Sequence, residues 1–281
     1  MSTTVINGLS VRSSGVADAP LTIIFLHYWG GSSRTWDKTI ESLLASNPNI
    51  RTVAVDQRGW GASTKPNDDP AADSIKGMAA DVEAILAGLT PKPKKVVLVG
   101  HSMGAKVSQL VAAKWKAQSG AATLAGLVLV SPAPPSPIIV PDDRKEQMLR
   151  TYDSADAIRG LLKNLLTAGD KGAGLSDEQI QQVVEDSTSG GALARESWPT
   201  RGLSEDIEAE VLKGLSGDGK VPILILMGEH DKVDPLPMVK EKVLAKLPDS
   251  KLVVIPSVGH LPPIEAGQEV GKYVAEFVSA L

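Results

Sequence analysis

The chain has 281 residues, of which 42% are hydrophobic and 22% are charged, and its formal net charge is −4. This composition is typical of a globular protein that buries a substantial core, as one domain or as a domain with an insertion. The mild negative charge gives no reason to expect nucleic acid or an anionic membrane as a partner. The absence of cysteine excludes disulfides, thiolate metal sites and a cysteine nucleophile.

The N-terminal residues do not combine a basic start with an apolar stretch, and no apolar run approaches membrane-spanning length. We therefore expect a cytoplasmic protein without a membrane partner. The sequence gives no indication of the oligomeric state.

The first predicted element is a β-hairpin, because Thr3–Ile6 and Leu9–Arg12 flank Asn7-Gly8, a pair suited to a type I′ turn. After the hairpin, short apolar runs alternate with amphipathic stretches. The apolar runs predict strands at 21–26, 51–55, 96–99, 127–130, 222–227 and 251–255. The amphipathic stretches predict helices at 36–45, 75–89, 105–116, 238–247 and 270–281. This alternation favours an α/β fold in which helices cover both faces of a mostly parallel sheet.

The alternation breaks between Ser131 and Gly219, where no buried strand is predicted. The proline-rich stretch 132–137 leads the chain away from the sheet in an extended conformation. Four helices are predicted after it, at 143–150, 155–167, 177–186 and 205–215, and Ser176 and Gln179 have the spacing of a capping box. We expect a core formed by residues 1–131 and 220–281 and an inserted all-helical cap formed by 132–219. The acidic character of this insertion disfavours strongly anionic substrates.

The most informative motif is Gly100-His101-Ser102-Met103-Gly104, which joins the predicted strand 96–99 to the predicted helix 105–116. A serine between two glycines on a strand-to-helix turn is held exposed above the strand ends. There it lies beside the positive end of the helix. We interpret Ser102 as a nucleophile. The alternative is that its hydroxyl only caps the helix.

A serine nucleophile needs a base, and the base needs an orienting acid. His260 follows the predicted strand 251–255, which places it at the same sheet edge as Ser102. Asp231 follows the predicted strand 222–227 and reaches that edge as the acid. Asp234 is the alternative acid, and its structural interpretation is that it starts the next helix. The order serine, aspartate, histidine matches the order of one class of hydrolases and differs from the orders of two classes of proteases.

The other three histidines have no assigned role in catalysis. We interpret His27 and His101 as structural, and His230 as a neighbour of the acid.

Taken together, these motifs resemble the α/β-hydrolase superfamily, in particular its cofactor-independent serine esterase and lactonase branch with a helical cap. The resemblance rests on the segments 27–31, 56–63, 100–104, 228–231 and 259–260. It implies that Ser102, His260 and Asp231 form a catalytic triad that cleaves a carboxylic ester or lactone through an acyl-enzyme. The segment 56–63 is interpreted as structural. No metal or nucleotide motif is present, so no cofactor is expected.

Acyl transfer also needs hydrogen-bond donors where charge develops on the attacked carbonyl. The backbone N–H of Met103 is predicted as one donor, and the resemblance points to Trp29 for the second. Tyr28 replaces the glycine that the family usually has there. Because tyrosine tolerates a positive φ poorly, either the loop differs in shape or the phenol enters the pocket. The candidates for lining the substrate pocket are Tyr28, Trp60 and Trp198.

Other functions fit part of the pattern. A non-catalytic ligand receptor or interaction protein can be built on the same fold, since function belongs to the site. Haloalkane or epoxide chemistry needs a carboxylate where Ser102 stands, and a peroxidase-like activity is expected only as a side reaction through a peracid. The predicted partner is a small, neutral acyl substrate. Its acyl length, and the choice among ester, lactone, thioester and amide, stay open.

Overall fold

The computed structural model describes residues 1–63, 70–115, 122–215, 221–247 and 249–281. Eight strands form one sheet: β1 (Ser2–Ile6), β2 (Leu9–Gly15), β3 (Leu21–Leu26), β4 (Arg51–Val55), β5 (Lys95–His101), β6 (Thr123–Val130), β7 (Ile223–Gly228) and β8 (Lys251–Ile255). Their order in the sheet is β1-β2-β4-β3-β5-β6-β7-β8. The β1–β2 and β2–β4 pairs are antiparallel, and all other neighbours are parallel. The predicted α/β fold with a mostly parallel sheet is therefore confirmed.

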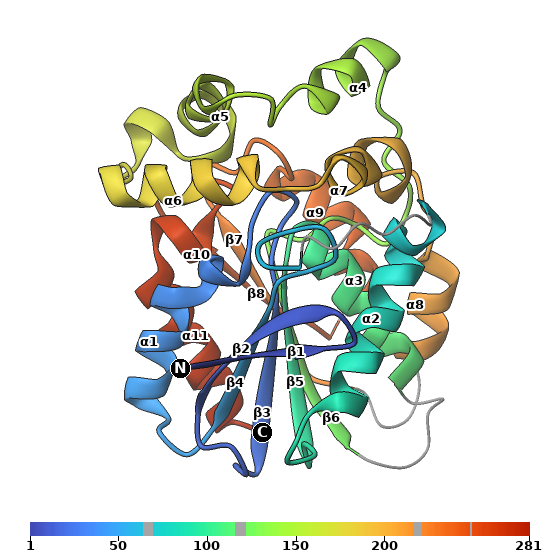
Figure 1. Ribbon diagram of the computed structural model, residues 1–281, viewed down its shortest axis with the longest axis vertical. Coiled ribbons are helices and arrows are strands. Elements are labelled where there is room, and N and C mark those ends of the chain that lie inside the picture. The colour runs from blue at the N-terminus through green and yellow to red at the C-terminus, as the bar shows by residue number, and fades with distance from the viewer. Residues whose placement is uncertain (64–69, 116–121, 216–220, 248) are drawn as a thin grey trace.

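The core helices are α1 (Asp37–Ser46), α2 (Ile75–Gly88), α3 (Met103–Trp115), α9 (Leu236–Lys242), α10 (Pro262–Glu265) and α11 (Gly267–Ser279). Helices cover both faces of the sheet (Figure 1). Two clusters of buried apolar side chains fill the spaces between the layers. α1 packs against α11 on one face, and α2 packs against α3 on the other. Because both faces are covered, the parallel strands are apolar along almost their whole length, as such sheets require.

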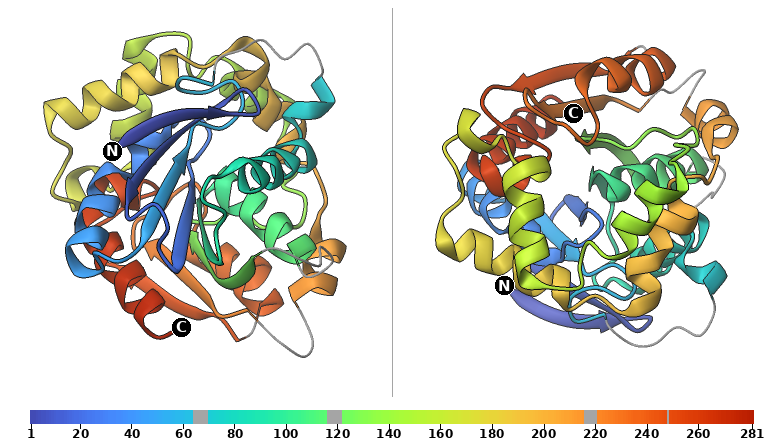
Figure 2. Two further views of the ribbon diagram at one scale, coloured as in Figure 1. Left: turned by 60° about the horizontal axis from the view of Figure 1, so that its bottom comes forward. Right: turned by 90° about the horizontal axis from the view of Figure 1, so that it is seen from above.

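The chain between β6 and β7, hereafter the inserted segment, contains no strand among its described residues. It contains α4 (Asp142–Leu149), α5 (Ala155–Leu161), α6 (Asp177–Thr188), α7 (Ala192–Ser197) and α8 (Glu208–Leu215). The first four lie over the carboxyl ends of the strands (Figures 1 and 2), whereas α8 packs along α3. The predicted capping box at the start of α6 is present. The expected boundary between residues 219 and 220 lies outside the described residues.

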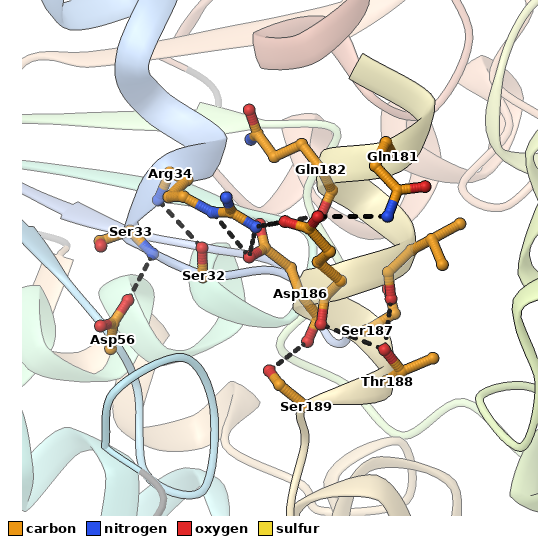
Figure 3. Close-up of polar contacts among 12 residues, drawn as sticks. Ser32, Ser33, Arg34, Asp56, Gln181, Gln182, Asp186, Ser187, Thr188 and Ser189 are labelled. Carbon is orange, nitrogen blue, oxygen red and sulfur yellow. Dashed lines mark hydrogen bonds and ion pairs between the residues drawn. The ribbon is translucent and has the colours of Figure 1, made fainter. Parts of the chain in front are cut away.

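A group of polar contacts, shown in Figure 3, ties the inserted segment to the loop after β3. Nε and Nη2 of Arg34 donate to the same oxygen of Asp186 on α6, at 2.9 and 2.7 Å. Nη2 also donates to Glu185 at 3.0 Å. On the core side, the backbone N–H of Ser33 donates to Asp56, which follows β4, at 2.7 Å. The loop after β3 is therefore bonded both to the inserted segment and to the loop that follows β4.

None of the helices in the described ranges has the length and apolar character needed to span a bilayer.

We predict that replacing Arg34 with methionine destabilises the protein by about 2 kcal/mol, because a nearly buried carboxylate then loses its donors. The side chain of Asp186 is only 8% exposed. The free energy of unfolding, measured by urea denaturation, checks this expectation. Lys38→Met is the matched control, because its ion pair with Glu41 is exposed and is expected to change stability by less than about 0.5 kcal/mol. Equal effects of the two substitutions would contradict a stabilising role for Arg34.

Candidate active site

Ser102 lies on the tight turn between β5 and α3, where its backbone adopts the left-handed φ of 52°. A Cβ on Gly100 would lie 2.3 Å from the carbonyl oxygen of Gly104. A Cβ on Gly104 would lie 2.4 Å from the carbonyl oxygen of Leu26. Both obstacles are backbone atoms, so no side-chain movement relieves them. The two glycines that the sequence motif supplies are thus sterically required, and the turn fixes Ser102 at the carboxyl edge of the sheet.

His260 and Asp231 face one another at the same edge, on the loops after β8 and β7. Nδ1 of His260 lies 3.0 and 2.9 Å from the two carboxylate oxygens of Asp231. Because an ionised carboxylate only accepts hydrogen bonds, Nδ1 carries the proton, and Nε2 of the neutral ring is free to accept one. One oxygen of Asp231 also accepts the backbone N–H groups of Val233 and Asp234, both at 2.9 Å. These bonds fix the carboxylate toward the imidazole.

The interaction between Asp231 and His260 shifts the pKa values of both groups. Burial opposes ionisation of Asp231, but the charge and hydrogen bond of His260 outweigh it and hold the pKa of Asp231 below its ordinary value. Burial likewise favours a neutral His260, but the charge and hydrogen bond of Asp231 raise the pKa of His260 above its ordinary value. An ionised acid beside a histidine that binds a proton readily is the arrangement of a general base.

His27 and His101 form hydrogen bonds to the backbone of the loops around the site. Burial lowers the pKa of His101 to about 3. Its neutral ring donates from Nε2 to the carbonyl oxygen of His260 at 2.6 Å, which helps to fix that loop. Burial lowers the pKa of His27 to about 4. Its Nε2 accepts the backbone N–H of Gln57 at 3.0 Å, and its Nδ1 donates to the carbonyl oxygen of Tyr28 at 2.7 Å. Both rings are thus engaged in hydrogen bonds to the backbone.

The loop after β3 accommodates Tyr28 without strain. The left-handed residue of this loop is Gly30, with φ 95°, and Tyr28 is not among the residues with positive φ. Tyr28 is buried and is one of the residues that line the pocket, and its ring centroid lies 5.1 Å from that of His101. The backbone N–H groups of Trp29 and Met103 form no hydrogen bond to another described residue, apart from any within α3. The left-handed position of this loop falls at Gly30, two residues after Tyr28, and a tyrosine is therefore accommodated there.

Ser102 and His260 line one cavity of about 310 Å³. Tyr28, Trp29 and Trp198 line it too, together with aliphatic side chains such as Leu161 and Leu165 of the inserted segment. The cavity therefore has a polar base and mostly apolar walls, as small-molecule sites commonly do.

Trp60 does not line this cavity, contrary to its interpretation as a pocket residue. It is fully buried, and its ring meets the ring of Tyr152 edge to face at a centroid distance of 5.8 Å. A Cβ on Gly190 would lie only 2.3 Å from the Trp60 ring, so the indole fills a space that the Gly190-Gly191 turn leaves open. Trp60 therefore packs against Tyr152, which lines the pocket, and is not itself a lining residue.

Sequence reasoning missed residues that hold the site together. Glu265 on α10 accepts the backbone N–H groups of Gly259 at 3.0 Å, Leu261 at 3.1 Å and Ala168 at 2.8 Å. It thereby joins the His260 loop to the inserted segment. Tyr152 donates its hydroxyl to the carbonyl oxygen of Trp29 at 2.6 Å. The signal available for Glu265 was an acid following Pro262-Pro263, a pair that often starts a helix.

The comparisons with known proteins agree with this architecture. A model of the alpha/beta hydrolase family matches residues 23–272. A bifunctional esterase/perhydrolase of Acinetobacter calcoaceticus is 29% identical over 276 residues, which cover 94% of this chain and 93% of that protein. The crystal structure of a bromoperoxidase from Bacillus anthracis has a TM-score of 0.82 at 17% identity, covering 99% of this chain and 100% of the other. An esterase from Exiguobacterium antarcticum has a TM-score of 0.77 at 19% identity, with 96% of each chain covered.

The fold and the serine-bearing turn define an α/β-hydrolase. The family match covers most of the chain, and the protein belongs to the alpha/beta hydrolase family. The resemblance to the α/β-hydrolase superfamily is thus confirmed.

The raised pKa of His260 predicts how reactivity at Ser102 depends on pH. The imidazole must be neutral to take the serine proton, so the rate of labelling by a fluorophosphonate should rise with pH through a midpoint above 6.5. In Asp231→Asn the rate should fall by about 100-fold or more, and the midpoint should move to lower pH because the charge that raises it is gone.

Glu229→Gln is the control, since Glu229 lies on the same loop but is half exposed and bonds only outside the site. This variant should keep the wild-type rate and midpoint. A wild-type midpoint at or below 6.5, or equal effects of the two substitutions, would contradict the pairing of Asp231 with His260.

Proposed function

We propose that the protein is a serine hydrolase that cleaves a carboxylic ester or lactone through an acyl-enzyme intermediate. The observation that carries this proposal is the arrangement of the pocket. Ser102 lies on a left-handed turn, and His260, whose Nδ1 is bonded to Asp231, lines the same cavity. The esterase activity named for the Acinetobacter calcoaceticus relative supports it.

In the first half of the reaction, Ser102 Oγ attacks the acyl carbon while Nε2 of His260 takes its proton. The electron pair of the carbonyl moves onto oxygen, where the backbone N–H groups of Met103 and Trp29 stabilise the negative charge. Met103 is the first residue of α3, so the helix dipole adds to this stabilisation. The tetrahedral intermediate then expels the alcohol, which takes the proton from His260.

In the second half, His260 takes a proton from water, and the resulting hydroxide attacks the acyl carbon of the acyl-enzyme. Collapse of this second intermediate returns the proton to Ser102 and releases the acid. For a lactone, the alcohol expelled first remains attached to the acyl group, and the product is a hydroxy acid. Asp231 stays ionised throughout and stabilises the imidazolium form of His260.

We further infer that residues 132–219 act as a cap over a core of residues 1–131 and 220–281. The inserted segment supplies Trp198, Leu161 and Leu165 to the cavity. Such walls favour a neutral substrate with an apolar acyl part. Peracid formation is a side reaction of the same acyl-enzyme when hydrogen peroxide replaces water, in keeping with the perhydrolase activity named for the relative.

The nucleophile is tested by labelling with a fluorophosphonate, which should modify Ser102 and abolish ester hydrolysis together. Ser102→Ala should lose both the label and the activity. Ser257→Ala should keep both, because Ser257 also has a left-handed φ, of 60°, but lies outside the cavity. A protein that is labelled but does not turn over would favour the ligand receptor, and a label that survives Ser102→Ala would overturn the assignment.

The cap is tested by two leucines of one π-helical turn. Leu165 lines the cavity, whereas Leu162 is 4% exposed and packs in the apolar core without lining it. Leu165→Ala should shift the preferred acyl length of p-nitrophenyl esters toward longer chains. Leu162→Ala should lower the free energy of unfolding by about 2 to 4 kcal/mol and leave the length profile unchanged. An unchanged profile in Leu165→Ala would mean that this part of the cap does not select the substrate.

A further inference from the structure

Asp234 brings a second carboxyl group into the cavity that Ser102 and His260 line. It lies on the loop after β7, three residues beyond Asp231, and only 3% of the residue is exposed. Its backbone N–H donates to Asp231 at 2.9 Å, so its main chain is fixed by the acid of the proposed triad. The carboxyl group itself has a different environment from that of Asp231.

The carboxyl group of Asp234 accepts no hydrogen bond from any residue in the described ranges. The two nearby cationic groups have other partners. Nζ of Lys106 donates to the carbonyl oxygens of Gly202 and Leu203 at 3.0 and 3.4 Å, and Nδ1 of His260 is bonded to Asp231. A buried carboxyl group without a partner is rare because its lost hydration is not replaced. We therefore expect a bound molecule to supply the missing partner.

Burial raises the pKa of Asp234 to about 7. The positive charges of His260 and Lys106 lower this pKa, and the negative charge of Asp231 raises it. Both protonation states of the carboxyl group are therefore present near neutral pH. A hydroxyl group donates and accepts hydrogen bonds, so it can pair with either state.

The remaining charges of the cavity restrict the partner further. Arg144 on α4 and Lys232 on the loop after β7 are exposed and also line the cavity. These two cations disfavour a positively charged ligand, and the carboxyl group of Asp234 disfavours a negatively charged one. The partner that fits all three groups is an uncharged hydrogen-bonding group.

We propose that Asp234 is a specificity-determining residue that binds a hydroxyl group of the substrate. The preferred substrate is then a neutral ester or lactone that carries a free hydroxyl group in addition to its apolar chain. This inference rests on the proposed function, because the cavity is the substrate pocket only if Ser102 is the nucleophile.

The test uses two matched pairs of esters. p-Nitrophenyl butyrate and p-nitrophenyl 3-hydroxybutyrate compare the acyl side, and butyl butyrate and 4-hydroxybutyl butyrate compare the alcohol side. In at least one pair, kcat/KM of the wild-type enzyme should be about 10-fold or more higher for the hydroxylated ester, because a site built to bind a hydroxyl rejects the analogue that lacks it.

In Asp234→Val the ratio of the two kcat/KM values should fall to about 1, since valine offers no hydrogen bond. Asp234→Asn keeps a polar group of the same size and should give an intermediate ratio. Glu229→Gln, which removes the other acid of this loop outside the cavity, should keep the wild-type ratio. Thermal unfolding confirms that each variant is folded, and the asparagine variant decides the test if the valine variant does not fold.

A wild-type ratio near 1 in both pairs would overturn the inference, and so would an unchanged ratio in the Asp234 variants. Equal losses of kcat on both members of a pair would also overturn it, because Asp234 would then act through His260. Fluorophosphonate labelling separates the two proposals. A wild-type enzyme that is neither labelled nor active refutes the proposed function, whereas a labelled, active enzyme without a hydroxyl preference refutes only the role of Asp234.

Discussion

The site depends on one steric constraint, the close approach of α3 to the ends of β5 and β3. Gly104 on the first turn of α3 contacts the backbone of Leu26, and Gly100 contacts the backbone of Gly104 itself. The chain makes this approach through the left-handed turn at Ser102. Because Leu26 and Gly100 are paired in register, the loop that follows β3 begins beside the serine. The same packing therefore places the side chain of Ser102 and the backbone of the neighbouring loop together.

The inserted segment contributes to the site through hydrogen bonds to the elements that carry it. Leu166 accepts the backbone N–H of His260 at 2.8 Å. Tyr152 donates to Trp29, and the buried ammonium group of Lys106 on α3 donates to Gly202. Each contact joins a different core element to the inserted segment, so a displacement of that segment would disturb the histidine loop, the loop after β3 and α3 together. The inserted segment is therefore structurally part of the site.

The sequence predicted the sheet well because its buried strands are continuous apolar runs, a signal that is local to each strand. It did not predict α7, a six-residue helix whose position is set by a distant contact. A Cβ on Gly59 would lie 2.5 Å from Cβ of Ala194, and the N–H of Gly191 donates to the carbonyl of Gly59. The predicted helix 238–247 is divided in the structure, because α9 starts after Pro235 and ends at Lys242 before a separate 3₁₀ turn. Hydrophobic periodicity indicates that a segment has an apolar face, but it does not indicate which element that face packs against.

Trp60 shows the same limit at the level of a single side chain. An aromatic residue in a loop at the carboxyl edge of a sheet can face the pocket or the layer behind it, and sequence spacing is identical in the two cases. The space beside Gly190 and the ring of Tyr152 decide the matter, and both belong to the inserted segment, more than ninety positions away. Only the fold brings these three residues together.

Asp231 and Asp234 differ in their environments because of the backbone between them. Both carboxyl groups follow the same strand, so their order along the chain does not distinguish them. Asp231 accepts the N–H groups two and three residues ahead, a local turn that aspartate commonly forms, and this turn holds its carboxylate against His260. Asp234 is a donor in that turn, and its own carboxyl group is left for the cavity. One short loop thus gives two chemically identical side chains different environments. Asp231 is bonded to His260 and to two backbone N–H groups, whereas the carboxyl group of Asp234 accepts no hydrogen bond from the residues that the structure describes.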